Sequence, residues 1–160
     1  MGSVVGYRGQ RAEGRGHEGR GQRAEGKMRI GSAKELKVYQ MAYVLAMEIF
    51  RLSKFWPAEE KYSLTDQIRR SSRGACANLR EAWAKRRYEA HFVSKLTDAD
   101  GENSETDTWL DFARDCGYLT DTDHARLVAE CREIGAMLGG MLANPTSFLL
   151  KPPRPVPSDP

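Results

Sequence analysis

The chain has 160 residues, of which 40% are hydrophobic and 29% charged, and its formal net charge is +3. This length fits one domain, no run of 18 or more apolar residues could span a membrane, and no apolar stretch near the amino terminus resembles a secretory signal. The three cysteines lack CxxC spacing, so we expect free thiols and a cytoplasmic protein rather than a disulfide scaffold.

The first 31 residues are rich in glycine and arginine and contain a direct repeat. The heptapeptide RGQRAEG stands at 8–14 and again at 20–26. Because few apolar side chains are available to offset the ordering of so many glycines, we expect residues 1–31 to form a disordered arm. Its arginines are suited to contact nucleic acid. The alternatives are that translation begins at Met28, or that the extension has no selected role.

Four segments with helical spacing of apolar residues follow, at 33–55, 63–87, 89–116 and 120–144. Pro57 is the single proline between residues 34 and 144, which favours helix because an interior proline costs about 3 kcal/mol. Short connections between such segments predict an all-α fold, an antiparallel up-down four-helix bundle over residues 32–145. Residues 146–160 hold five of the seven prolines and are expected to form an extended tail.

Local signals place the ends of these helices. Ser63, with Asp66 three residues later, is expected to cap the second helix. Gly117 supplies the left-handed residue that ends the third helix, and Thr120 or Asp121 caps the fourth.

The first helix is apolar on more than one side, because Met41, Val44 and Met47 fall outside the arc that faces the bundle. A helix of this kind is buried twice, so we expect these three residues to contact another subunit of a homo-oligomer. The third helix instead has two polar residues, Asn103 and Thr106, within its apolar stripe. Either this helix is broken near Gly101, or the polar pair meets Asn78 and Glu81 in a buried network; we favour the network.

Charge is distributed unevenly along the chain. Residues 61–95 carry nine Lys and Arg against three acidic residues, whereas residues 98–123 carry nine acidic residues against one arginine. Placed on a helical wheel, four arginines of the second helix fall within about 40° of one another: Arg69, Arg73, Arg80 and Arg87.

Two interpretations of this arginine line remain open. Each guanidinium can donate a bidentate, charge-assisted pair of hydrogen bonds to a backbone phosphate, which predicts nucleic-acid binding. Alternatively, the arginines are solvated, or pair with the acidic third helix of the same or a neighbouring subunit.

No pattern in the sequence predicts catalysis, and we expect no catalytic residues, no metal and no cofactor. A di-iron bundle needs two Glu-x-x-His pairs, and only Asp121-x-x-His124 is similar. The acidic stretch at 98–102 lacks the register of a calcium loop. Cys76, which stands among small residues, is better explained as a core cysteine than as a nucleophile.

Several short runs resemble a known family: LKVYQMA at 36–42, YSLTDQIRRSS at 62–72, GYL at 117–119 and IGAML at 134–138. They are similar to four-helix-bundle proteins encoded in intervening sequences of 23S ribosomal RNA genes, over about residues 34–142. The resemblance implies an up-down bundle that assembles into a homopentamer and has no known enzymatic activity. The sequence departs from the family pattern at GACANLREA (74–82), where a proline and a glycine are missing.

A distant relative of that family, the accessory protein of diversity-generating retroelements, binds a reverse transcriptase and nucleic acid through a basic surface. The resemblance thereby implies that Arg69 and Arg70, in the matching Gln-Ile-Arg-Arg run, belong to such a surface. We therefore expect a non-enzymatic, pentameric scaffold that presents arginines to RNA, DNA or a nucleic-acid enzyme. The alternative is a protein–protein adaptor without nucleic-acid binding. The expected binding residues are Arg69, Arg70, Arg73, Arg80 and Arg87.

Overall fold

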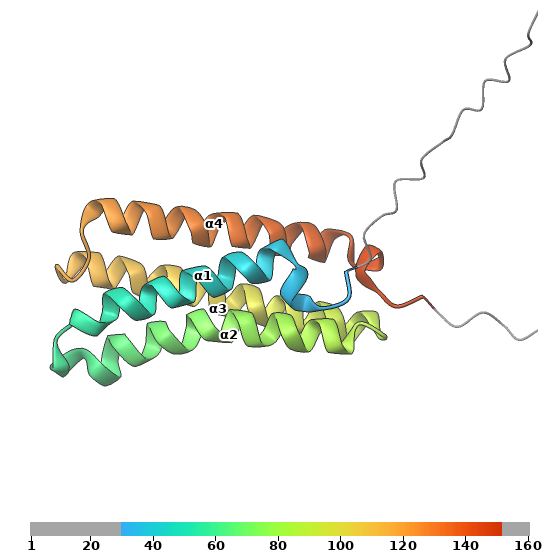
Figure 1. The fold of residues 1–160 in the computed structure, drawn as a ribbon, viewed down its shortest axis with the longest axis horizontal. Coiled ribbons are helices and arrows are strands. Elements are labelled where there is room, and N and C mark those ends of the chain that lie inside the picture. Colours follow the sequence, from blue (N-terminus) through green and yellow to red (C-terminus); the bar gives the residue numbers. More distant parts are fainter. Residues whose placement is uncertain (1–29, 152–160) are drawn as a thin grey trace, which may run out of the picture.

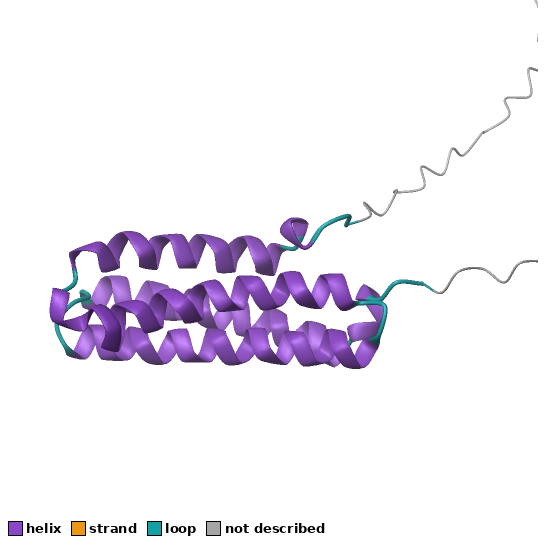
Figure 2. Cartoon of the chain, turned by 90° about the horizontal axis from the view of Figure 1, so that it is seen from below, coloured by secondary structure: helices purple, strands orange, loops and turns teal. Residues whose placement is uncertain are grey.

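The computed structural model describes residues 30–151, and four long helices run side by side within them (Figure 1). These helices are α1 (Lys37–Leu52), α2 (Asp66–Lys85), α3 (Glu89–Asp115) and α4 (Asp121–Ala143). Each runs antiparallel to the next, and α1 and α3 both pack between α2 and α4. Figure 2 shows the same helices from below, with no strand among the described residues. The predicted all-α, antiparallel four-helix bundle is confirmed.

The core of the bundle is built from one apolar stripe per helix. In α3 the buried residues are the seven at the predicted helical spacing, from Phe92 and Leu96 through to Leu110 and Ala113. Each large apolar side chain that is fully buried stabilises the fold by about 1.5–3 kcal/mol relative to leaving it exposed. No helix in the range 30–151 is both long and apolar enough to cross a membrane.

Two of the three predicted helix boundaries are confirmed. Gly117 has a φ of 81°, which ends α3 in the left-handed region, and the Thr120 hydroxyl accepts a hydrogen bond from the Asp123 amide at 3.0 Å. The predicted Ser63 cap is wrong, because the backbone is already helical from Lys61, where a π turn (Lys61–Thr65) leads directly into α2. The Ser63 hydroxyl instead donates to Glu60 Oε2 at 2.8 Å.

The first predicted helix, 33–55, is divided into three parts. A short 3₁₀ helix (Ala33–Glu35) is separated from α1 by extended backbone at Leu36, and a second one (Ser53–Phe55) follows α1.

At the other end of the chain, a 3₁₀ helix (Pro145–Phe148) places the Phe148 ring 6.1 Å from the ring of Phe92. The part of the chain that packs on the bundle therefore extends beyond residue 145, where the bundle was predicted to end. The predicted arm lies outside the described residues up to residue 29, and the tail does so from residue 152.

The polar pair in α3 is buried in an unbroken helix, but its partners differ from those expected. Asn103 Nδ2 donates to the Cys131 carbonyl at 2.9 Å, and Thr106 Oγ1 lies 2.9 Å from Ser71 Oγ. Asn78 and Glu81 bind Lys95 instead. The antiparallel register explains this correction: it places residue 71 opposite 106 and residue 81 opposite 95, about two to three helical turns away from the polar pair.

We expect Thr106→Val to lower the free energy of unfolding by about 1 kcal/mol, because the change keeps the shape of the side chain and removes one buried hydroxyl. Ser71→Ala should cost a similar amount. Since both substitutions remove the same contact, the double variant should cost less than the sum of the two, with a coupling of about 1 kcal/mol in urea unfolding. Strict additivity would show that the two hydroxyls do not interact.

Candidate nucleic-acid interface

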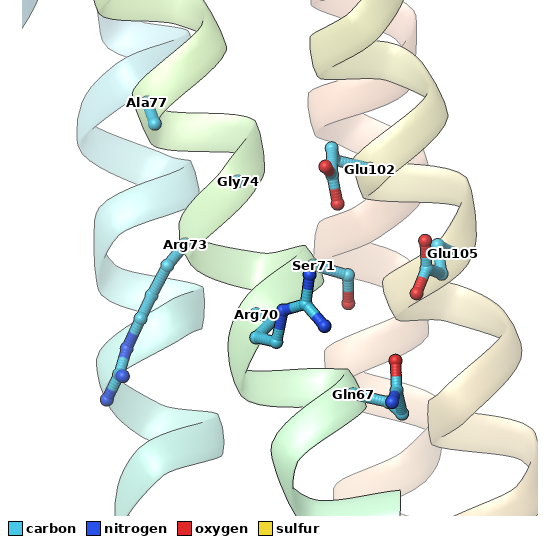
Figure 3. A pocket seen from close by; sticks show the side chains of 8 residues that line it. All are labelled: Gln67, Arg70, Ser71, Arg73, Gly74, Ala77, Glu102 and Glu105. Atoms are coloured by element: carbon cyan, nitrogen blue, oxygen red, sulfur yellow. The ribbon is translucent and has the colours of Figure 1, made fainter.

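The predicted arginines do not form a single line in the structure. Arg69, Arg73 and Arg80 lie along the side of α2 that adjoins α1. Figure 3 shows Arg73 extending over α1 while Arg70 points the other way, toward α3. Arg87 lies outside α2, because the helix ends at Lys85 and residues 86–88 form the turn to α3. The helical wheel placed Arg87 in line only because it assumed that the helix continued.

Three cations surround one aromatic ring where α1 and α2 meet. The Phe50 ring centroid lies 4.7 Å from Lys54 Nζ, 5.0 Å from Arg69 Cζ and 5.6 Å from Arg73 Cζ. Arg69 Nε also donates to the buried Ser53 hydroxyl at 2.8 Å. Cation–π contacts orient a guanidinium without neutralising its charge. The cations of this cluster are therefore held in position, and no carboxylate of residues 30–151 neutralises their charge in an ion pair.

None of the five predicted arginines forms an ion pair within 4.0 Å across residues 30–151. Other cations of the bundle do form such pairs: Lys95 binds Glu81, and Arg126 binds Glu48. Arg80 instead donates to the Ser32 hydroxyl at 3.2 Å. Within residues 30–151, therefore, these arginines form no ion pair with the acidic α3 of the same chain, although Arg70 faces Glu102 across a groove.

The opposite side of α2 carries mixed charge. A shallow groove of about 550 Å³ lies between α2 and α3, and Figure 3 shows Arg70 on one wall and Glu102 and Glu105 on the other. Burial raises the pKa of Glu102, repulsion from Glu105 raises it further, and Arg70 lowers it. The Glu102 carboxyl group packs so closely on Gly74 that a Cβ there would lie 2.6 Å from its carbon. This groove is poorly suited to phosphate because its carboxylates oppose Arg70.

Helix α1 presents two outward strips. Of the residues predicted to contact another subunit, Val44 is 58% exposed and Met47 is half-buried. Met41 was predicted to lie outside the bundle-facing arc, but it is half-buried and packs against the core of its own bundle. The second strip adjoins α2 and contains Tyr39 and Tyr43, whose rings stack with centroids 6.3 Å apart.

Sequence reasoning missed this second strip, because it considered only Met41, Val44 and Met47 outside the face of this helix that meets the bundle. The available signal was the spacing of Tyr39, Tyr43 and Phe50, which places three rings on one side of a helix. These rings and the neighbouring cations that form no ion pair within residues 30–151 together make up the α1–α2 surface: Tyr39, Tyr43, Phe50, Lys54, Arg69, Arg73 and Arg80.

Other candidate reactive groups are engaged in the fold. Cys76 is buried, and burial raises the pKa of its thiol to about 11, which disfavours the thiolate that a nucleophile needs. His124 Nε2 lies 2.7 Å from Asp111 Oδ1 on α3, so its imidazole contacts a neighbouring helix. The acidic stretch at 98–102 lies within α3 and is helical.

A family model described as 23S rRNA-intervening sequence protein matches residues 34–140, which is more than half of the chain. Among solved structures, a protein of unknown function from the S23 ribosomal protein family of Bacteroides thetaiotaomicron is similar, with 30% identity and a TM-score of 0.62. The match covers 67% of this chain and 96% of that protein. Comparison with curated proteins gives no match. The chain therefore belongs to the 23S rRNA-intervening sequence protein family.

Proposed function

We propose that this protein is a non-enzymatic, homo-oligomeric scaffold of the cytoplasm whose α1–α2 surface binds RNA or DNA. The nucleic acid is bound either alone or together with an enzyme that acts on it, such as a reverse transcriptase. One observation carries the proposal: Arg69, Arg73 and Arg80 form no ion pair within the described chain and line one side of α2.

Fixed, unneutralised arginines suit phosphate for two reasons. A guanidinium that already has its orientation loses less side-chain entropy on binding a phosphate oxygen. A row of them also releases condensed counterions from the nucleic acid, which supplies much of the affinity in such complexes. In this surface, Ser53 orients Arg69 and Ser32 orients Arg80.

The homo-oligomer is inferred from the other outward strip of α1, where Val44 is exposed and Met41 and Met47 are half-buried, Met41 against the core. Five copies is the number that the family resemblance suggests. The three free cysteines, of which Cys76 and Cys131 are buried, suit a reducing compartment and support a place in the cytoplasm.

A protein–protein adaptor is the second candidate, because the acidic residues Glu102 and Glu105 on α3 also form no ion pair within the described chain. In an oligomer, these carboxylates of one subunit could pair with the arginines of the next. The arginines would then hold the assembly together instead of binding phosphates.

Sedimentation of the purified chain with a fluorescently labelled RNA, at low salt, tests the proposal. We expect the protein alone to sediment as a multiple of the chain mass and to carry the RNA with it. An assembly that leaves all RNA and DNA probes behind would favour the adaptor. A single-copy protein would contradict the homo-oligomer.

A further inference from the structure

Aromatic rings and arginines share the seam between α1 and α2. Phe50 lies against Arg73 at one end of this seam, and Ser32, which precedes α1, binds Arg80 at the other. Because the two helices are antiparallel (Figure 1), Tyr43 lies between these two contacts. It is seven residues from Phe50, two helical turns and about 10 Å along the same side of α1. Along α1, the Tyr43 ring therefore lies between the residues that contact Arg73 and Arg80.

The Tyr43 ring is open to solvent and held in position. Residue Tyr43 is 53% exposed, in contrast to the half-buried Tyr39 and Phe50. The Tyr39 ring, which lies one helical turn earlier in α1, stacks on the Tyr43 ring with an angle of 22° between the two ring planes. An exposed, supported ring beside fixed cations is the arrangement on which unpaired bases stack while arginines bind the phosphates between them.

The shape of this surface disfavours duplexes. Proteins that read duplex DNA insert one helix into a major groove about 12 Å wide. Two packed helices, each about 10–12 Å in diameter, are too wide to enter that groove together. On a duplex, the Tyr43 ring would face the sugar-phosphate backbone, because the bases are stacked inside. On a single strand, the bases are free to turn toward the protein.

We infer that the α1–α2 surface binds single-stranded nucleic acid and that a base stacks on Tyr43. This inference rests on the proposed function, since it names the substrate class of the same surface. Arg73 and Arg80 would bind the phosphates on either side of the stacked base, and the Tyr39 ring would support Tyr43 from below.

Fluorescence anisotropy with three labelled probes of one sequence tests the inference: a single strand, its duplex, and the single strand with abasic sites. We expect the wild-type chain to bind the single strand at least about fivefold more tightly than the other two, which corresponds to one stacked base. Tyr43→Leu should lose the same factor for the single strand only. Tyr43→Phe, which keeps the ring, should bind like wild type. Circular dichroism checks that each variant is folded.

Failure of this inference differs from failure of the proposed function. If the duplex binds as tightly as the single strand, or if Tyr43→Leu keeps full affinity for it, stacking on Tyr43 is wrong while nucleic-acid binding stands. If Tyr43→Leu changes the mass of the oligomer, Tyr43 is a subunit contact, and the inference is overturned. If no probe binds the wild-type chain at low salt, both proposals fail.

Discussion

Charge reversal at two positions of the α1–α2 surface, Arg73→Glu with Arg80→Glu, should weaken nucleic-acid binding at least about 100-fold. Each charge-assisted hydrogen bond to a phosphate contributes about 1.5–3 kcal/mol, and the new carboxylates add repulsion. Both side chains are exposed, so the bundle should keep its fold. Anisotropy titration at fixed salt measures the change in the dissociation constant.

The control for net charge is Lys37→Glu with Arg132→Glu, which changes the charge equally on exposed positions away from the α1–α2 surface. It also removes the exposed ion pair of Lys37 with Glu133, so circular dichroism must show that this variant is folded. This control should change affinity only a few-fold, through the net charge. Equal losses in the two double variants would mean that binding is a general charge effect. Loss of the oligomer in the Arg73/Arg80 variant, with no nucleic acid bound by the wild type, would identify these arginines as subunit contacts and support the adaptor.

Replacing Phe92 by alanine should lower the free energy of unfolding by about 3–5 kcal/mol. Phe92 is fully buried near the start of α3 and stacks on Phe148, so its removal leaves a cavity where α3 meets the segment after α4. A loss of this size approaches the whole stability of a small domain. Urea unfolding at one protein concentration measures it, because subunit association also adds to apparent stability.

Phe112 provides the comparison within the same helix. Its side chain is 54% exposed and contacts the Trp109 ring at the other end of α3. Phe112→Ala should cost less than about 1 kcal/mol. Similar losses at the two positions would contradict the assignment of Phe92 to the core.

The fold could be predicted because the spacing of apolar residues within each helix identifies the face that is buried. In α3, the positions of Phe92, Leu96 and Leu110 identify the buried face without any knowledge of the neighbours. Glycine at 117 and threonine at 120 act through their own backbone, so these two ends were also readable. Ser63 was misread because a π turn extends the helix upstream of it.

The partners of side chains across helices could not be predicted in the same way. Asn103 and Thr106 were expected to meet Asn78 and Glu81, but the register of α2 against α3 decides which residues face each other. A wheel drawn for one helix contains no information on that register. It identified a polar pair that needs partners, and it did not identify the partners.

The arginine surface was predicted only in part, because its composition also depends on how α1 packs against α2. The wheel correctly grouped Arg69, Arg73 and Arg80, which do share one side of α2. It could not show that Phe50 lies beneath two of them, since that contact depends on how α1 packs. That no carboxylate of residues 30–151 lies within ion-pairing distance of these arginines is likewise a property of the packed bundle.

The salt dependence of single-strand binding by the wild-type chain tests most directly whether these arginines bind phosphates. Three phosphate contacts to Arg69, Arg73 and Arg80 predict that the logarithm of the association constant falls with the logarithm of salt concentration, with a slope of about −2 or steeper. A slope near zero, or no binding at the lowest salt, would contradict a phosphate-binding surface.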